Sequence, residues 1–385
     1  MGGGSGSDTH SVPTDLLQVG PERRGPPRWS RWMLLPVVGV IAAVGVVQAG
    51  SGAPRSVPEA TMTAGTAQPS PTRAAPAVAL TELGHPLLGV TGGWELFGRG
   101  DRQVVRIELA RGRVTTSTVP VLLSTGPVSF VVTADRALVR PIDRVPGYMV
   151  PDGRPVVPMP SSLSQFGPAF AGPRPGTVWV QSGDGPHAVM QLRAVDGGPV
   201  LATIRVPEPN GLWEMTSDST GYLLLRLTGG YYHATSSGLR LITRGALLAS
   251  GAATFLTLDC DEIHRCRSVV TDRATGARRT LGVPLSADMP RGAVAPNGRS
   301  AAMFRIRRQG ALTLSLLNLV AGTERTIDLP IHLGVVEGSV VWSPDSRWLL
   351  AVGTDGAIHA VDPATGHVTT LGVSLPALSQ LAVRP

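Results

Sequence analysis

Two cysteines, at positions 260 and 266, are the residues whose type and spacing point most directly to chemistry. They enclose the sequence DEIHR, and a strand-like apolar run lies on each side of them. Thiols that face each other across a hairpin in an exported domain form a disulfide. A metal site made by both cysteines with Asp261 and His264 is the alternative, but the spacing C-x5-C lacks a second ligand pair. The sequence therefore favours a disulfide that fixes a polar loop.

That loop is also the place where we expect a partner to bind. Its polar side chains are Asp261, Glu262, His264 and Arg265. A disulfide pre-organises such a loop, which lowers the entropy cost of binding. A loop that is closed only for stability is the equally weighted alternative. We expect the partner to be an envelope protein or a glycan.

The sequence contains few signals of catalytic chemistry. The eight histidines are scattered, at positions 10, 85, 187, 233, 264, 332, 359 and 367. Neither a nucleophile elbow, nor a zinc-protease helix, nor a phosphate-binding loop occurs. We therefore assign no catalytic residue, no cofactor and no metal ligand from the sequence. Asp345 and Asp362 are interpreted as structural turn acids, and Trp179, Trp213, Trp342 and Trp348 as packing residues.

A turn signal recurs seven times between residues 108 and 366 and indicates the fold. Its clearest copies are ELARG at 108–112, DRATG at 272–276, NLVAG at 318–322 and DPATG at 362–366. An Asp or Asn side chain can hydrogen-bond nearby backbone N–H groups, and glycine supplies the positive φ that ends the turn. The glycines lie 38 to 46 residues apart, at positions Gly112, Gly153, Gly198, Gly238, Gly276, Gly322 and Gly366. This period, filled with short strands, is typical of β-propeller blades; unrelated hairpins in a β-sandwich would not keep such regular spacing.

A second repeat precedes the later glycines. The sequence WSPDSRWLLA at 342–351 has a relative, VAPNGRSAAM, at 294–303. In both, a strand ends at proline, turns, and re-enters an apolar strand. This element resembles the W-S-P-D-G-x-x-L-A repeat of TolB-like and WD-repeat-like β-propellers, with Ser346 in place of the usual glycine. The resemblance implies a propeller fold and leaves the activity open, since these families differ widely in function.

The repeats predict an all-β, seven-bladed propeller over residues 85–385. The last blade is expected to place strand a near 339–343, b near 348–353, c near 358–362 and d near 367–372. The first blade starts at strand b, near Trp94, so the run from Leu378 to Pro385 is expected to complete it and close the ring. The Cys260–Cys266 hairpin then connects strands b and c, whereas the seven glycine turns connect c and d. The two kinds of loop lie on opposite faces, and we expect the tether to arrive on the glycine-turn face.

The N-terminal region predicts a membrane tether. Residues 1–32 carry no apolar period and are expected to form a disordered cytoplasmic tail. Residues 33–49 are uncharged and apolar, and Arg23, Arg24, Arg28 and Arg31 precede them. The positive-inside rule then places the N-terminus in the cytoplasm. The segment is predicted to be a single transmembrane helix acting as a signal anchor; cleavage as a signal peptide near Ala49 is the alternative.

Composition supports export and argues against nucleic-acid binding. Residues 50–84 are rich in Pro, Ala and Thr and predict an extended linker. All 34 basic residues are arginine, which is typical of a high-GC genome such as an actinobacterial one. The net charge of +7 is spread along the chain with few aromatics, which is not a nucleic-acid pattern.

Two functions remain open at this point. One is a membrane-tethered extracytoplasmic propeller that binds or scaffolds a protein, peptide or cell-wall glycan. The other is a glycan hydrolase or lyase whose acids meet only in space around the central funnel. Carboxylates with raised pKa values in the funnel would favour the enzyme, and an apolar or arginine-lined rim would favour binding.

Overall fold

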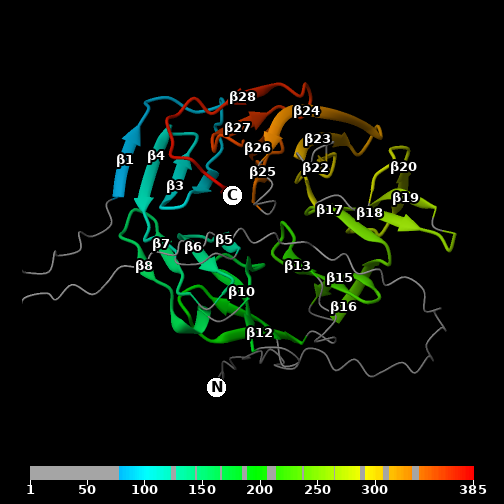
Figure 1. Ribbon diagram of the computed structural model, residues 1–385, viewed down its shortest axis with the longest axis horizontal. Coiled ribbons are helices and arrows are strands. Elements are labelled where there is room, and N and C mark those ends of the chain that lie inside the picture. Colours follow the sequence, from blue (N-terminus) through cyan, green and yellow to red (C-terminus); the bar gives the residue numbers. More distant parts are fainter. Residues whose placement is uncertain are drawn as a thin grey trace, which may run out of the picture. The chain divides into compact units, whose positions relative to one another are not determined.

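The apolar runs around each repeated turn form antiparallel strands that assemble as a ring of sheets (Figure 1). The computed structural model describes residues 78–122, 127–143, 145–164, 167–183, 189–205, 214–235, 238–263, 265–286, 291–306, 312–331 and 338–385, which all belong to one unit. The predictions for residues 1–32, 33–49 and 50–77 concern parts of the chain outside the described residues. Within these ranges the chain is all-β apart from the short 3-10 helix η1 (Ser161–Leu163).

Five of the sheets contain four or five strands each. The first has the order β1-β4-β3-β2-β29, with the bounds Val78–Glu82 (β1), Glu95–Arg99 (β2), Gln103–Glu108 (β3), Arg113–Thr118 (β4) and Gln380–Arg384 (β29). The second contains β5 (Val128–Val132), β6 (Arg136–Pro141), β7 (Tyr148–Pro151) and β8 (Val157–Pro158). The third contains β9 (Ala169–Ala171), β10 (Thr177–Ser182), β11 (Val189–Ala194) and β12 (Val200–Arg205). The fourth contains β13 (Glu214–Ser217), β14 (Leu223–Leu227), β15 (Gly230–Thr235) and β16 (Gly238–Thr243). The last contains β25 (Val340–Trp342), β26 (Leu349–Val352), β27 (Ile358–Val361) and β28 (Val368–Thr370).

The remaining sheet has eight strands, in the order β20-β19-β18-β17-β21-β22-β23-β24. Their bounds are Ala246–Ser250 (β17), Thr254–Cys260 (β18), Cys266–Asp272 (β19), Arg278–Leu281 (β20), Gly292–Val294 (β21), Ser300–Ile306 (β22), Leu312–Asn318 (β23) and Thr323–Ile331 (β24).

The eight-stranded sheet corrects the expected count of seven separate blades. Its two four-strand groups are joined by β17 and β21, which pair in parallel at Ala249↔Gly292 and Ser250↔Ala293. All four residues of these two pairs are small, which allows the two backbones to approach each other. The described chain thus forms five separate blade-like sheets and one double sheet.

The predicted closure of the ring is confirmed. Strand β29 pairs antiparallel with β2 over five residue pairs, from Glu95↔Arg384 to Arg99↔Gln380. Apolar side chains then fill the space between neighbouring sheets. The core cluster around Leu96, Ile107 and Leu381 also contains Leu350 and Ile358 of the last sheet.

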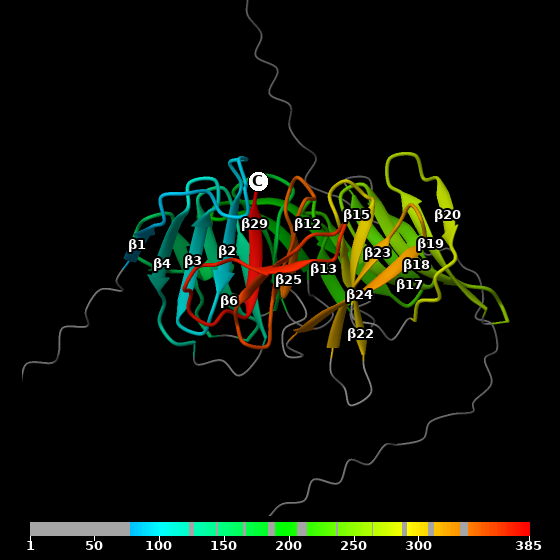
Figure 2. The ribbon, with the colours of Figure 1, turned by 90° about the horizontal axis from the view of Figure 1, so that it is seen from above.

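The strand directions give the ring two faces, seen edge-on in Figure 2. We call the face with the connections β2–β3 and β18–β19 the disulfide face, and the opposite face, with the connections β3–β4 and β19–β20, the glycine-turn face. Strand β1 runs antiparallel to β4 and pairs Val78 with Ser117 and Glu82 with Arg113. Because Gly112 immediately precedes Arg113, Glu82 lies at the glycine-turn face and Val78 at the disulfide face.

Strand β1 therefore corrects two expectations. The linker was expected to reach residue 84, but residues 78–82 form the exposed fifth strand of the first sheet. The tether was expected to arrive on the glycine-turn face, but the described chain begins at Val78, on the disulfide face. The physical reason is the extra strand β1, along which the chain runs from the disulfide face to the glycine-turn face before it enters β2.

A positive backbone φ explains why glycine occurs at most of the repeated turn positions. Six of the seven have positive φ, and the exception is Gly198. At that turn Gly197 takes φ of 83°, while Gly198 donates its N–H to Asp196 Oδ1. The sequence DGG offers two adjacent glycines, so spacing alone assigned the wrong one.

Candidate functional site

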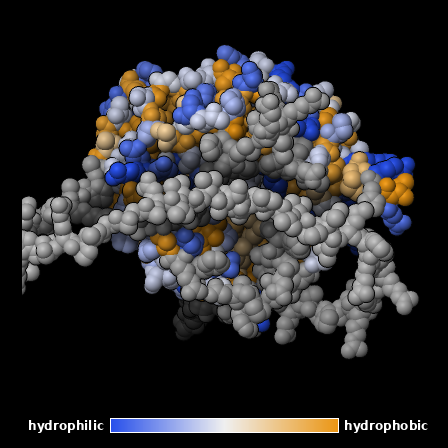
Figure 3. Space-filling view, in the orientation of Figure 1, coloured by the Kyte–Doolittle hydropathy of each residue, from blue (hydrophilic) through white to orange (hydrophobic). Residues whose placement is uncertain are grey.

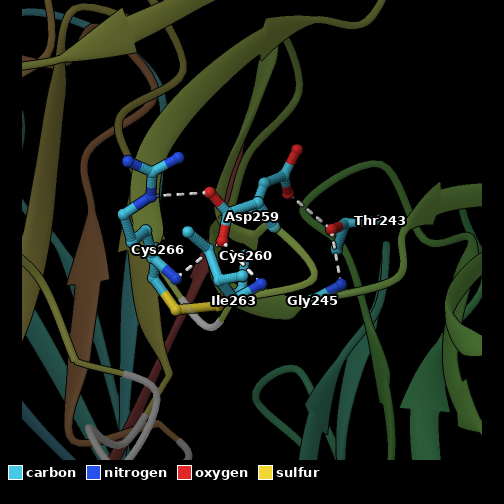
Figure 4. The surroundings of a disulfide bond; sticks show 8 residues. Thr243, Gly245, Asp259, Cys260, Ile263 and Cys266 are labelled. Carbon is cyan, nitrogen blue, oxygen red and sulfur yellow. Dashed lines mark hydrogen bonds and ion pairs between the residues drawn. A yellow bond between two sulfur atoms is a disulfide. The ribbon is translucent and has the colours of Figure 1, made fainter.

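A disulfide joins Cys260 and Cys266 at the end of the hairpin formed by β18 and β19 (Figure 4). The two cysteines are direct cross-strand partners, as Thr254 and Asp272 are at the other end. The strand run before Cys260 and the strand run after Cys266 fold onto each other and bring the sulfur atoms together.

The end of the hairpin beside the disulfide is tied to the neighbouring sheet. The Asp259 carboxylate accepts a hydrogen bond from Thr243 Oγ1 at 2.6 Å and pairs with the Arg278 guanidinium. Thr243 Oγ1 in turn accepts the N–H of Gly245 at 2.9 Å. The hairpin thus projects from a fixed support.

The loop itself is organised by Asp261, which was a candidate binding residue. Its Oδ1 accepts the backbone N–H of Ile263 at 3.1 Å and that of Arg265 at 2.8 Å. Its Oδ2 pairs with Arg265 Nε at 2.9 Å. The backbone hydrogen bond from Arg265 contributes most to lowering the pKa of the Asp261 carboxyl. The side chains of Asp261 and Arg265 therefore pair with each other, and that of Asp261 also stabilises the turn.

The other loop residues have different environments. Glu262 is exposed, and His264 lies outside the described residues. Ile263, which sequence reasoning did not select, is 67% exposed at the tip. Over the described part of the surface in view, hydrophilic and apolar side chains are interspersed (Figure 3). The exposed residues of the described loop are thus Glu262, Ile263 and the mutually paired Asp261 and Arg265.

A cavity of about 1450 Å³ runs through the centre of the ring. The innermost strands β5, β9, β13, β17, β21, β25 and β29 all contribute to its lining. Connections on the glycine-turn face, including those that contain Arg174, Ser219 and Pro344, form one mouth. The cavity is the concave site that the fold provides, and ligand sites usually are such apolar hollows with a few polar groups.

Four charged residues form a network on one side of this cavity, between the first two sheets. Arg384 pairs with Glu95 and, at 2.6 Å, with Asp152. Arg106 pairs with Glu95 and lies 3.5 Å from Asp152. The Arg384 guanidinium also lies 4.7 Å from the centre of the Phe97 ring. Each carboxylate therefore has two arginine partners.

Asp218 forms a second polar network at the mouth. Its side chain is fully buried and lies 2.7 Å from Arg273 Nη2 and 3.3 Å from His233 Nε2. Its Oδ1 accepts hydrogen bonds from the N–H and hydroxyl of Thr220. Burial acts to raise the pKa of Asp218, but hydrogen bonds from His233 and Thr220 and the charge of Arg273 outweigh it and lower the pKa. The carboxylate holds two sheets together as an anion.

The residues interpreted as structural behave as such where they are described. Trp179 Nε1 donates to Gly221 O, and Trp342 Nε1 donates to Ala293 O, each at 2.9 Å and each into the neighbouring strand group. Asp362 Oδ1 accepts the N–H of Ala364 at 2.7 Å inside its turn. Trp213 lies outside the described residues.

The cavity residues were missed in the sequence because no local motif contains them. Glu95 and Arg384 lie 289 positions apart, and Asp152 belongs to a different sheet. Only the expectation that the C-terminal strand closes the first blade pointed to their meeting. A search of the described residues finds no group of three metal-ligating side chains. Among the same residues, none of the helices is long and apolar enough to span a bilayer.

No family model and no curated protein matches the sequence. Similar solved structures include TolB from Acinetobacter baumannii, with 12% identity, a TM-score of 0.42, and coverage of 76% of this chain and 82% of that one. The periplasmic gluconolactonase of Pseudomonas aeruginosa has 16% identity and a TM-score of 0.42, and the match covers 75% of this chain and 98% of that one. An oligogalacturonate lyase in complex with manganese has 12% identity and a TM-score of 0.46, and the match covers 76% of this chain and 89% of that one. Likenesses of this size assign neither an activity nor a ligand.

Proposed function

We propose that this chain is a membrane-tethered, extracytoplasmic binding or scaffold module for a protein, a peptide or a cell-wall glycan. The observation that carries the proposal is the central cavity, whose innermost strands present mostly small and apolar side chains. Partly exposed residues such as Phe130, Val341 and Ala382 line it. A concave apolar wall of this kind stabilises a bound ligand, because binding removes apolar surface from water.

The state of the cavity carboxylates favours binding over acid catalysis. A general acid that cleaves a glycosidic bond needs a raised pKa so that it holds a proton near neutral pH. The pKa of Asp218 is lowered instead. Glu95 and Asp152 are each ion-paired with Arg106 and Arg384 rather than open to a ligand. These acids are therefore suited to holding the ring together.

A glycan hydrolase or lyase remains the second candidate. The observation in its favour is that Glu95 and Asp152 line the same cavity and share both arginines. A ligand that displaced the arginines would leave two carboxylates facing it. Recovery of a cleaved glycan would therefore identify the enzyme, and recovery of an intact ligand would identify the binding module.

The location is proposed from the sequence. Residues 33–49 form the membrane anchor in this proposal, and residues 50–77 the linker. A tether that continues into Val78 joins the propeller at the disulfide face. The cavity mouth beside Arg174 then opens on the opposite face, away from the attachment point.

The proposal is tested with the full chain in lipid nanodiscs. Soluble cell-wall glycan fragments and envelope peptides are equilibrated with the protein by dialysis and then analysed by mass spectrometry. The variant Ala382→Phe adds bulk at a partly exposed, cavity-lining position, and Ala321→Phe adds the same group at an exposed glycine turn. Retention of an intact ligand by wild type and Ala321→Phe, with loss in Ala382→Phe at an unchanged melting temperature, supports the binding module. Equal retention by both variants places binding outside the cavity.

A further inference from the structure

The arginines that line the cavity are not equivalent. Arg106 and Arg384 are paired with Glu95 and Asp152, and Arg291 also takes part in a contact. Arg174 is exposed at the glycine-turn mouth. Among the residues that the structure describes, no carboxylate lies within ion-pair distance of Arg174. One positive charge at the mouth is therefore available to a ligand.

The backbone around Arg174 holds this charge in a defined place. Pro173 and Pro175 flank it, and each fixes its own φ. Thr177 closes the turn, because its N–H and its Oγ1 both donate to the carbonyl oxygen of Arg174, at 3.1 Å and 2.7 Å. A turn ordered in advance loses less entropy when its side chain binds.

The neighbouring connection supports the same turn. A Cβ on Gly221 would lie 2.3 Å from the backbone of Gly172, so the connections β9–β10 and β13–β14 are in close contact. The second connection brings the exposed Ser219 to the same mouth. Asp218, beside Ser219, is neutralised by Arg273, so it does not cancel the charge of Arg174.

The wall beyond the mouth has a different character. Phe130, Val132, Val341 and Ala382 line the cavity and are partly exposed, so their apolar surfaces face the open space. A ligand that covers this part of the wall must present apolar surface to it. A ligand that also uses Arg174 must carry an anionic group at one end.

We propose that the cavity binds amphipathic anions, with the apolar body in the channel and a carboxylate or phosphate group at Arg174. This proposal rests on the binding function proposed above and names the ligand class. Arginine is well suited to either head group, because its planar fork donates two parallel hydrogen bonds to them.

The test uses the full chain in nanodiscs and a matched pair of water-soluble probes, 4-phenylbutyrate and 4-phenylbutan-1-ol. Affinities are measured by isothermal titration calorimetry, with empty nanodiscs as the blank. We expect the wild type to bind the carboxylate about tenfold more tightly than the alcohol, since hydrogen bonds between charged groups are stronger than those to a neutral hydroxyl. Phenylbutyl phosphate, measured alongside, shows which anionic head group binds more tightly.

Three variants separate the charge from the wall. Arg174→Gln should lower the affinity for 4-phenylbutyrate about tenfold and leave that for the alcohol unchanged. Ala382→Phe should weaken both. Arg347→Gln, at an exposed position outside the cavity lining, should change neither.

Equal affinity of the wild type for both probes, or an unchanged affinity for the carboxylate in Arg174→Gln, overturns the inference and leaves the binding function standing. If neither probe binds to the wild type, the inference is also overturned. The binding function is then judged on glycans and peptides alone.

Discussion

Glycines in this fold are required for two separable reasons, and a matched pair distinguishes them. Gly112 and Gly153 have almost the same positive φ, 62° and 61°. A Cβ on Gly112 would lie 2.0 Å from His85 O, whereas a Cβ on Gly153 would meet nothing within 4 Å. The first position needs glycine for backbone conformation and for space, and the second for conformation alone.

We therefore expect Gly153→Ala to lower the free energy of unfolding by about 1–2 kcal/mol, the cost of a left-handed conformation for a residue with a Cβ. Gly112→Ala should cost more, because the connection that contains His85 must also shift. Urea denaturation of both variants measures the difference. Equal losses would show that the connection containing His85 yields freely to the added methyl group.

The Asp218 network predicts an acid-dependent stability. Burial acts to raise the pKa of this carboxyl, but hydrogen bonds from His233 and Thr220 and the charge of Arg273 lower it below the ordinary value of 3.8. A carboxyl with a lowered folded-state pKa contributes stability that is present above the unfolded-state pKa and lost as the pH falls through the folded-state pKa.

Asp218→Asn should therefore cost about 3–5 kcal/mol at pH 7, because Arg273 is left without its buried partner. The difference from wild type should shrink as the pH falls below 3.8. Urea denaturation at pH 7, 4 and 2.5 checks both statements. A difference that is the same at all three pH values would contradict the ionic role of Asp218.

At the scale of elements, the disulfide closes a short hairpin that other contacts already hold. Seven residue pairs join β18 and β19, and Asp259 ties their end to Thr243. The double substitution Cys260→Ser/Cys266→Ser should thus lower the free energy of unfolding by only about 2 kcal/mol, the value for a short loop in the chain-entropy model. Mass spectrometry of a non-reduced digest should find one Cys260–Cys266 crosslink, and two freely alkylated thiols in envelope-purified protein would refute it.

The sequence predicted the elements that local chemistry specifies. In the last sheet, β25, β26, β27 and β28 each lie within the stretch expected for strands a to d. Alternating side chains and Asx turns carry this information within a few residues. Strand β1 was missed because it directly follows the Pro- and Ala-rich linker and all five of its residues are exposed. The β17–β21 pairing was missed because it depends on the approach of two backbones far apart in sequence.

The candidate site was less predictable for the same reason. The cavity takes a few residues from each innermost strand, so no window of sequence contains it. Arg174 differs from the cavity-lining Arg106 and Arg384 because its surroundings lack an acid, and that is a property of three-dimensional packing. The polar loop at Asp261 was visible in sequence, but its internal pairing with Arg265 was not.

At the scale of the whole molecule, the two faces have distinct roles in the proposed arrangement. Val78 and the disulfide hairpin share one face, and the mouth with Arg174 lies on the other. A module attached at Val78 presents its open mouth away from the attachment point. This polarity has meaning only if the chain crosses the membrane once, with the propeller outside.

That topology is the last prediction, and fusions to alkaline phosphatase test it. The enzyme is active only outside the cytoplasm, so a fusion after residue 30, before the apolar segment, should be inactive. Fusions after Ala60 and after Pro385 should both be active and should sediment with membranes, because residues 33–49 follow four arginines that keep the N-terminus inside. Activity found only in the soluble fraction would establish cleavage near Ala49, and an inactive Pro385 fusion would overturn export itself.

Replacing Arg23, Arg24, Arg28 and Arg31 with serine serves as the control for the orienting charge. It should lower the activity of the Pro385 fusion without changing the total amount of membrane-bound protein.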